Sequence, residues 1–292
     1  MRVCTLRLDG QETAAVVTAA GAVPVKWINA YLGRGWPTDL LSLIEQGLSP
    51  LLVRDAEQTP RVVERSAASY GPLFRRPRKI WGIGLNYKDH AADLSAAFPT
   101  EPASFMKGDH TIIGPGDTIE LPPDSERVTA EAELGVIIGR ECRCVREDDA
   151  SDYIAGYCLI LDMTAEDILQ RNPRFLTRAK NYDTFFSFGP ELITPDEVLD
   201  VSRLRVGTWK NGALHRENLV ANMAFPPHFL VAFHSNVMTL HPGDLISTGT
   251  PGAVVIEPGD VAECRIEGLG TLSNPVRRRL GEGYKGLASI GV

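Results

Sequence analysis

The chain has 292 residues, of which 43% are hydrophobic, so it can bury a substantial core as one large domain or as a large and a small one. Its formal net charge is −7 and no run of Lys or Arg exceeds three residues, which argues against nucleic acid as a partner. Because no apolar stretch reaches roughly 18 residues and the first residues lack a secretory signal, we expect a cytoplasmic protein that does not enter membranes.

The N-terminal part is predicted to form a small unit of its own. Two apolar runs, Val3–Leu8 and Thr13–Val17, flank Asp9-Gly10, a dipeptide typical of a two-residue hairpin turn. A helix is expected over Asp39–Gln46. The Gly- and Pro-containing segment Ser66–Arg78 then indicates a linker.

A boundary near residue 72 therefore separates a small N-terminal domain, residues 1–72, from a catalytic domain, residues 73–292. In the second domain, short strands are expected at Lys79–Ile83, Ala132–Ile138, Tyr157–Leu161, Asp244–Ser247, Val254–Ile256 and Val261–Ile266, with a hairpin at Asn211-Gly212 inside Val206–Leu214. Helices are expected at Tyr87–Ala97, Ala165–Leu169 and Pro226–Asn236. This pattern predicts an α+β, β-rich fold rather than a doubly wound parallel sheet.

The segment with the strongest chemical signal contains two glutamates. Glu131 and Glu133 are two apart in a predicted strand, so both side chains lie on one face. Adjacent carboxylates repel each other and resist burial, and they are tolerated when solvated, when one is protonated, or when a cation binds between them. A solvated strand end and a cation site are both compatible with this segment.

Asp162 favours the cation site. It follows the apolar strand Tyr157–Leu161 and precedes a predicted helix start at Met163–Ala165. An aspartate there often caps the helix, but Thr164 to Asp167 already offers a capping box. A third carboxylate would complete an all-oxygen site, which suits Mg²⁺ or Mn²⁺, with Ca²⁺ as a further candidate.

Other candidate residues lie in the segment Gly82–Asp93. Gly82 and Gly84 do not start a dinucleotide-binding loop, because Tyr87 occupies the third glycine position. His90 and Asp93 are three apart on a predicted helix, where the carboxylate can fix the imidazole tautomer and leave the other ring nitrogen as a base.

Lysines and a turn complete the set of candidates. Lys107 and Lys180 are candidate partners of an anionic ligand, and Lys180 lies among aromatic residues. The small-residue turn Ser247–Gly252 would let its backbone approach a carboxylate closely.

Taken together, these segments resemble the fumarylacetoacetate hydrolase family in order and spacing, over roughly residues 79–276. The matching segments are GLNYKDHAAD, FMKGDHTIIGPGDTIELP, EAELGVIIG, AGYCLILDMTAED, AKNYDTFFSFGP, the Asn-Gly hairpin, LHPGDLISTGTPG and GDVAECRIEGLGTLSNPV. The resemblance implies a mixed β-roll or β-sandwich catalytic domain, a homodimer, and Glu131, Glu133 and Asp162 as metal ligands.

The resemblance also implies roles for the remaining residues. His90 matches the general base, with Asp93 as its acidic partner, and Glu263 loosely matches a carboxylate that orients the base in some members. Lys180 matches a lysine that contacts substrate oxygens. The substrate-binding residues implied are Asn86, Tyr87, Lys107, Arg178, Gly249 and Thr250.

The chain departs from the family pattern at three places. Asp93 replaces a glutamate, and Leu85 stands where acylpyruvate hydrolases often have an arginine. Glu166 and Leu169 occupy positions where an arginine and a glutamine often stabilise an oxyanion, and Gln170 follows one place later. Arg171, Arg178 or Lys180 would have to substitute, or the reaction is not hydrolytic.

The working hypothesis is hydrolysis of a carbon–carbon bond in a small 2,4-dioxo acid, such as an acylpyruvate, through a metal-stabilised enolate. His90 would deprotonate the attacking water and Lys180 would offset the developing charge. The main alternative is decarboxylation, isomerisation, tautomerisation or dehydration of a related 2-oxo acid. A binding protein without catalysis is a third hypothesis, which the intact His90 and the three carboxylates disfavour.

Overall fold

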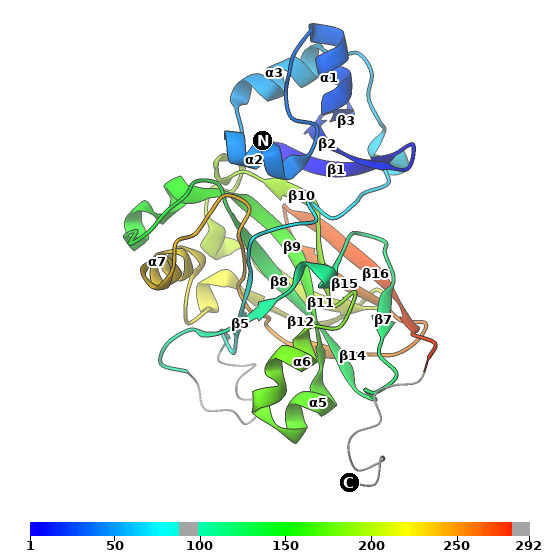
Figure 1. The fold of residues 1–292 in the computed structure, drawn as a ribbon, viewed down its shortest axis with the longest axis vertical. Coiled ribbons are helices and arrows are strands. Elements are labelled where there is room, and N and C mark those ends of the chain that lie inside the picture. The colour runs from blue at the N-terminus through cyan, green and yellow to red at the C-terminus, as the bar shows by residue number, and fades with distance from the viewer. Residues whose placement is uncertain (88–98, 282–292) are drawn as a thin grey trace.

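The computed structural model describes residues 1–87 and 99–281, and it divides them among short helices and many strands (Figure 1). The strands are β1 (Arg2–Leu8), β2 (Gln11–Thr18), β3 (Gly21–Pro24), β4 (Ile80–Gly84), β5 (Ala103–Lys107), β6 (Ile112–Ile113), β7 (Ile119–Leu121), β8 (Val128–Ile138), β9 (Ile154–Ala165), β10 (Phe186–Ile193), β11 (Arg205–Lys210), β12 (Ala213–Leu219), β13 (Leu245–Ser247), β14 (Ala253–Ile256), β15 (Val261–Ile266) and β16 (Gly270–Arg278). The α-helices are α1 (Val25–Leu32), α2 (Leu40–Gln46), α3 (Pro50–Gln58), α5 (Glu166–Arg171), α6 (Leu176–Lys180) and α7 (Pro227–Val237). The prediction of an α+β, β-rich fold is confirmed.

Both predicted hairpins form. Asp9 and Gly10 have φ of 54° and 75°, and Asn211 and Gly212 have φ of 54° and 76°. Two successive positive φ values are the geometry of the turns that match the twist of the flanking strands, which explains the choice of Asp-Gly and Asn-Gly. The predicted helices at residues 39–46 and 226–236 correspond to α2 and α7. The helix expected at residues 87–97 lies almost wholly outside the described residues.

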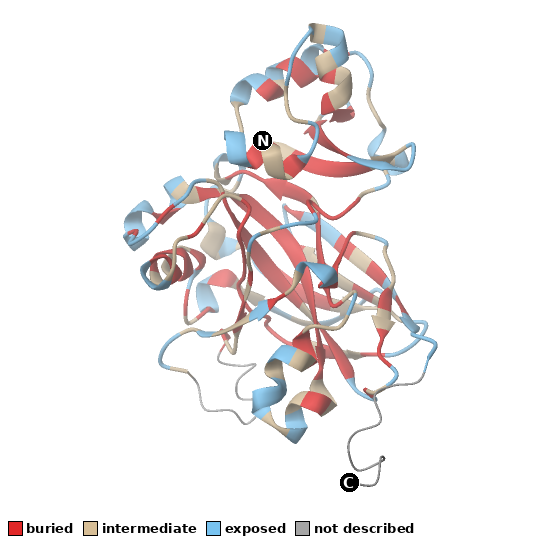
Figure 2. Ribbon diagram, viewed as in Figure 1, coloured by how far each residue is buried: buried red, intermediate tan, exposed pale blue. Residues whose placement is uncertain are grey.

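A large sheet carries the order β3-β2-β1-β10-β9-β8-β13-β4-β5, and β14 and β6 add to it by pairing with β8 and β10. A second sheet has the order β12-β11-β15-β16-β7 and packs against β8 and β9 of the large sheet. The central strands of the large sheet are almost entirely buried (Figure 2). Strands buried on both faces read as nearly continuous apolar runs, and the apolar runs of β8 and β9 fit this rule.

The two faces of β8 belong to two different hydrophobic cores. Ala132, Leu134 and Val136 contribute to the core shared with the second sheet. Ile137 faces the other way, into a core shared with Ile160 and with residues of the N-terminal unit. The glutamates of β8 belong to this second face, so they stand at the polar end of an otherwise apolar row.

The N-terminal strands continue the large sheet. β1 pairs antiparallel with β10, for example at Val3 opposite Leu192. The helices α1 and α3 pack on β2, so this unit covers one end of the sheet (Figure 1). The boundary near residue 72 stays a prediction. Within the described residues, no helix is both long and apolar enough to cross a membrane.

Candidate metal centre

The candidate centre lies on the adjacent antiparallel strands β8 and β9. Glu131 and Glu133 are two residues apart in β8, so they share one face. Asp162 is directly opposite Glu131 in the register of the two strands and therefore lies on that same face. One carboxylate oxygen from each residue lies within 4.8 Å of the others. The predicted convergence of these three side chains is confirmed.

The local secondary structure around Asp162 differs from the prediction. β9 continues through Ala165, and α5 begins only at Glu166, with no side-chain cap at its start. The predicted helix start at Met163–Ala165 and the capping box are therefore wrong, because the strand keeps pairing with β8 as far as Val128 opposite Ala165. Asp162 thus lies inside a strand, where it cannot act as a helix cap.

Two of the three carboxylates are almost completely buried, and the third, Glu131, has a side chain that is 13% exposed. Glu133 is 1% exposed and Asp162 is not exposed at all, so the solvated strand end considered above does not occur. Burial, together with the charges of Asp162 and Glu131, raises the pKa of Glu133 to about 8. Grouped buried carboxylates are costly unless positive charge lies among them.

Two lysines supply part of that charge. Lys107 Nζ lies 2.5 Å from one Asp162 oxygen, and Lys180 Nζ lies 2.6 Å from the other. Lys180 Nζ also lies 3.1 Å from Glu131 Oε2. The end of α6 is attached to the end of β5, because the Asn181 side chain accepts a hydrogen bond from Gly108 N at 2.7 Å. This attachment brings two lysines that are distant in sequence to one aspartate.

The pKa values of the two lysines move in opposite directions. Burial lowers the pKa of Lys107 to about 8, although Asp162 opposes this shift. Burial acts the same way on Lys180, but Asp162, Glu131 and Glu133 outweigh it and raise the pKa of Lys180. Lys180 is therefore the ammonium that the carboxylates hold more firmly.

Further hydrogen bonds fix the glutamates, and two of their donors, Thr164 and Ser247, are not among the predicted site residues. Thr164 Oγ1 donates to Glu131 Oε1 at 2.5 Å. Ser247 Oγ and Gly249 N both donate to Glu133 Oε2, at 2.5 and 2.8 Å. Thr164 could have been found as the residue two places after Asp162 on the same strand face, and Ser247 as the first residue of the small-residue turn.

These residues fit a hard divalent cation. The donor set is three carboxylates without sulfur or imidazole, which is the chemistry that Mg²⁺, Mn²⁺ and Ca²⁺ prefer. Among the described residues, Glu133 Oε1 has no hydrogen-bond partner, and each Asp162 oxygen accepts from a single lysine. A carboxylate oxygen has two lone pairs, so all three residues keep capacity for an ion.

Gly249 has a conformation and a neighbourhood that exclude a side chain. Its φ is +95°, and a Cβ would lie 2.8 Å from Asn86 Cβ. We expect Gly249→Ala to lower the free energy of unfolding by about 1–3 kcal/mol and to weaken Mg²⁺ binding, because the donor to Glu133 would shift. The matched control is Gly212→Ala, where φ is +76° and nothing lies within 4 Å. Chemical denaturation and Mg²⁺ titration of both variants measure this, and an equal loss of Mg²⁺ affinity in the two would contradict it.

Asn86 supports the turn from behind. The Asn86 amide donates to Thr248 O at 2.7 Å and to Phe225 O at 2.9 Å, and its oxygen accepts from Phe225 N. These bonds use both amide hydrogens and fix Asn86 behind the turn, and its contact with substrate stays a prediction. The Tyr87 side chain is fully buried, and burial, with the nearby charge of Glu133, raises its pKa.

Of four other predicted residues, the structure places two, and neither belongs to the carboxylate cluster. Thr250 is buried in the turn, and its hydroxyl interacts with the backbone of Gly252. Arg178 Nη2 pairs with Asp124 at 2.7 Å, outside the carboxylate cluster. His90 and Asp93 lie outside the described residues, so their roles stay predictions.

Glu263 is not brought to the cluster. Its neighbour Cys264 points to the backbone oxygen of Glu133, so strand alternation turns Glu263 to the opposite face of the second sheet. There its carboxylate pairs with Arg265 at 2.9 Å and accepts from Gly212 N. Glu263 therefore does not face the cluster, and because His90 lies outside the described residues, the loose match of Glu263 to a base-orienting carboxylate stays a prediction.

Two of the residues that depart from the family pattern, Glu166 and Leu169, lie on α5. Glu166 pairs with Arg127 at 2.7 Å, and Arg171 pairs with Asp167 at 3.2 Å. Leu169 packs against the core. Of the residues considered as replacements for the missing donors, Lys180 contacts the carboxylate cluster directly.

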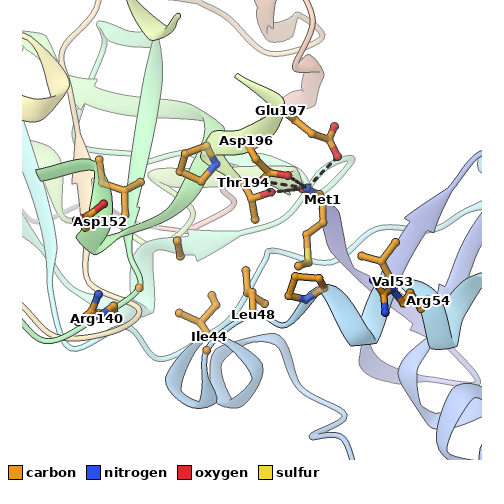
Figure 3. Close-up of a pocket in the computed structure, with 16 residues that line it drawn as sticks. Met1, Ile44, Leu48, Val53, Arg54, Arg140, Asp152, Thr194, Asp196 and Glu197 are labelled. Carbon is orange, nitrogen blue, oxygen red and sulfur yellow. Dashed lines mark hydrogen bonds and ion pairs between the residues drawn. The ribbon is translucent and has the colours of Figure 1, made fainter. Parts of the chain in front are cut away.

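A separate cavity of about 820 Å³ lies between the N-terminal unit and the start of β9 (Figure 3). Its lining includes Ile44, Leu48 and Val53 on one side and Arg140 on the other. Ile154, also in the lining, begins β9, and Asp162 follows it by eight residues. At roughly 3.3 Å per residue the two lie about 26 Å apart, so this cavity is not part of the carboxylate cluster.

Comparison with known proteins establishes the family. The family described as Fumarylacetoacetate (FAA) hydrolase C-terminal matches residues 79–277. The chain belongs to the fumarylacetoacetate hydrolase family.

Its relatives in this family catalyse different reactions. The chain is 36% identical to the 2,4-didehydro-3-deoxy-L-rhamnonate hydrolase of Sphingomonas sp. (strain SKA58), over 97% of this chain and 99% of that protein. It is 34% identical to a mitochondrial oxaloacetate tautomerase of Xenopus laevis, over 85% of this chain and 81% of that protein. Hydrolysis and tautomerisation are thus both represented among similar proteins.

A similar solved structure contains a metal ion. It is the maleylpyruvate hydrolase from Sphingobium sp. SYK-6 in complex with manganese(II) and pyruvate. The TM-score is 0.79 at 29% identity, over 96% of this chain and 100% of that one. The fold is therefore of the fumarylacetoacetate hydrolase type, and the carboxylate cluster is suited to a metal ion.

Proposed function

We propose that this protein is a metal-dependent hydrolase that cleaves a carbon–carbon bond in a small 2,4-dioxo acid. The reaction would convert R–CO–CH₂–CO–COO⁻ and water into R–COO⁻, pyruvate and a proton. The C3–C4 bond breaks, its electron pair stays on the pyruvate fragment as an enolate, and that carbon later takes up a proton.

The observation that carries this proposal is the combination of three carboxylates and two ammonium groups in one buried cluster. When all three carboxylates are ionised, as metal ligands must be, the charges of Glu131, Glu133 and Asp162 sum to −3, and Lys107 and Lys180 bring the total to −1. A divalent ion would change it to +1, which attracts an anionic oxo acid. Coulomb attraction is strong in such a site because the surroundings are nearly dry.

The residues of the chain have distinct tasks in this reaction. Glu131, Glu133 and Asp162 would hold Mg²⁺ or Mn²⁺, which supplies Lewis-acid polarisation of the oxo group when bound. Lys180 offsets the negative charge that develops on the substrate oxygens. His90 is proposed as the base that takes a proton from water.

Two similarities support the choice of reaction. The relative that matches over nearly its whole length acts, by its name, on a 2,4-didehydro-3-deoxy acid, which is a 2,4-dioxo compound. The structure with manganese also contains pyruvate, which is the product fragment expected here.

A second candidate function is tautomerisation of a 2-oxo acid such as oxaloacetate, which needs no attacking water. The observation in its favour is the pair of departures on α5, where Glu166 is bound to Arg127 and Leu169 packs in the core. Losing one oxyanion donor costs a hydrolase about 10²–10³ in rate, whereas proton shuttling on an enol is less demanding. The similarity to an oxaloacetate tautomerase supports this candidate.

Product analysis separates these functions. Purified protein with Mg²⁺ or Mn²⁺ is incubated with acetylpyruvate and, separately, with freshly dissolved enol-oxaloacetate. We expect acetate and pyruvate in equal amounts from the first substrate and no release after chelation of the metal. If enol-oxaloacetate absorbance falls faster with the protein than without it, and acetylpyruvate yields no acetate, the tautomerase is favoured. Inactivity on both, together with no metal binding, would favour a binding protein.

A further inference from the structure

The two faces of the edge strand β5 have different neighbours. Lys107 reaches Asp162, so this face of β5 is turned to the carboxylate cluster. Phe105 is two residues earlier and shares that face. Ser104 is turned the other way, where its hydroxyl lies 3.0 Å from His234 Nε2. The ring of Phe105 therefore lies on the side of the cluster.

A glycine on the neighbouring strand makes room for this ring. Gly82 is paired with Phe105 across β4 and β5, and with Ser247 across β4 and β13. A Cβ on Gly82 would lie only 2.2 Å from Phe105 Cζ, so the ring covers the glycine. Because Ser247 binds Glu133, one continuous row on this face leads from the carboxylate to the aromatic ring.

The ring also contacts the lysine of the cluster. Lys180 Nζ lies 4.7 Å from the centroid of the Phe105 ring, within the range of a cation–π contact. The Lys180 side chain is 6% exposed, whereas Phe105 is only half-buried. An apolar surface thus remains open beside the charged groups.

We infer that Phe105 is the specificity-determining residue of this site and packs against the tail of the substrate, the part beyond its oxo-acid end. This inference rests on the proposed function, because it assumes that the oxo-acid end binds at the cluster. The ring offers apolar surface against which an apolar or aromatic tail can pack, whereas a second carboxylate placed there would lose hydration without gaining a hydrogen bond. The substrate class is therefore an oxo acid with an uncharged tail.

Binding of tail-bearing acids tests this inference without requiring turnover. In the presence of Mg²⁺ or Mn²⁺, calorimetry compares oxalate, which has no tail, with phenylpyruvate and 2-oxoglutarate. The wild-type protein should bind phenylpyruvate more tightly than 2-oxoglutarate. Phe105→Ala should lose about fivefold in affinity for phenylpyruvate, the value of one aromatic contact, and less than about twofold for oxalate.

Three further variants make the test specific. Phe105→Leu keeps an apolar side chain and should lose less than Phe105→Ala. Gly82→Ala displaces the ring through its new Cβ and should reproduce the loss of phenylpyruvate affinity. Met106→Ala, on the other face of β5 and 47% exposed, should bind all three acids like the wild type.

The outcomes also separate this inference from the proposed function. If the wild type binds oxalate but does not prefer phenylpyruvate, or if Phe105→Ala loses as much affinity for oxalate as for phenylpyruvate, the role of Phe105 is wrong. If the wild type does not bind oxalate with either metal, the proposed function fails, and the inference fails with it.

Discussion

Asp162→Asn is expected to weaken Mg²⁺ binding by more than about 100-fold and to abolish turnover. Removing a residue that merely supports a ligand typically costs 10–100-fold in metal affinity, and a ligand should cost more. The substitution keeps the shape of the side chain but removes the charge that both Lys107 and Lys180 contact. Isothermal titration with Mg²⁺ and Mn²⁺, followed by activity measurements at saturating metal, gives both quantities.

Two controls accompany this variant. Asp167→Asn changes an aspartate of α5 that binds Ser125 and Arg171 outside the cluster, and it should leave metal binding unchanged. His90→Ala should spare metal binding while abolishing hydrolysis, because it removes a base and not a ligand. Wild-type metal affinity in Asp162→Asn would contradict the assignment of the centre.

Lys180→Met is expected to reduce turnover by about 10²–10³ while Mg²⁺ affinity stays equal or becomes tighter. The first effect follows from loss of the cation that offsets charge on the substrate. The second follows from Coulomb's law, since a positive group beside the metal ligands is removed. In the metal-free protein the variant should also unfold more readily, by about 3–5 kcal/mol, because Glu131 and Asp162 lose a buried partner.

Lys79→Met is the matched control for Lys180→Met. Lys79 Nζ lies 2.6 Å from Asp244, another buried aspartate, outside the metal centre. This control should lose stability without any change in metal affinity or in turnover at saturating metal. Mg²⁺ added to Lys180→Met should restore much of its lost thermal stability and should not do so for Lys79→Met. A parallel response of both variants would mean that Lys180 is merely structural.

The carboxylate cluster was predictable from sequence because it depends on one local rule and one adjacent strand pair. Glu131 and Glu133 share a face through strand alternation alone. Asp162 joins them because β8 and β9 are neighbours and lie in register. Pairing also explains the error at the end of β9, since nothing local indicates that Met163 to Ala165 still have partners on β8.

The positions of the two lysines, of Phe105 and of Glu263 depend on tertiary contacts that no local sequence pattern encodes. Lys107 reaches Asp162 only because β5 and α6 come together at Asn181. Phe105 lies beside the cluster because Gly82, on the neighbouring strand, has no Cβ and leaves room for its ring. The face that Glu263 occupies follows from the pairing of β15 with β11, which brings Cys264 and not Glu263 toward β8.

Anomalous diffraction from crystals soaked with Mn²⁺ and oxalate tests the central claim most directly. We expect a manganese peak about 2.0–2.2 Å from one oxygen of each of Glu131, Glu133 and Asp162, with oxalate completing the coordination. A manganese peak elsewhere would contradict it. So would the absence of a peak at the cluster at saturating Mn²⁺, because Lys107 and Lys180 alone would then neutralise the carboxylates.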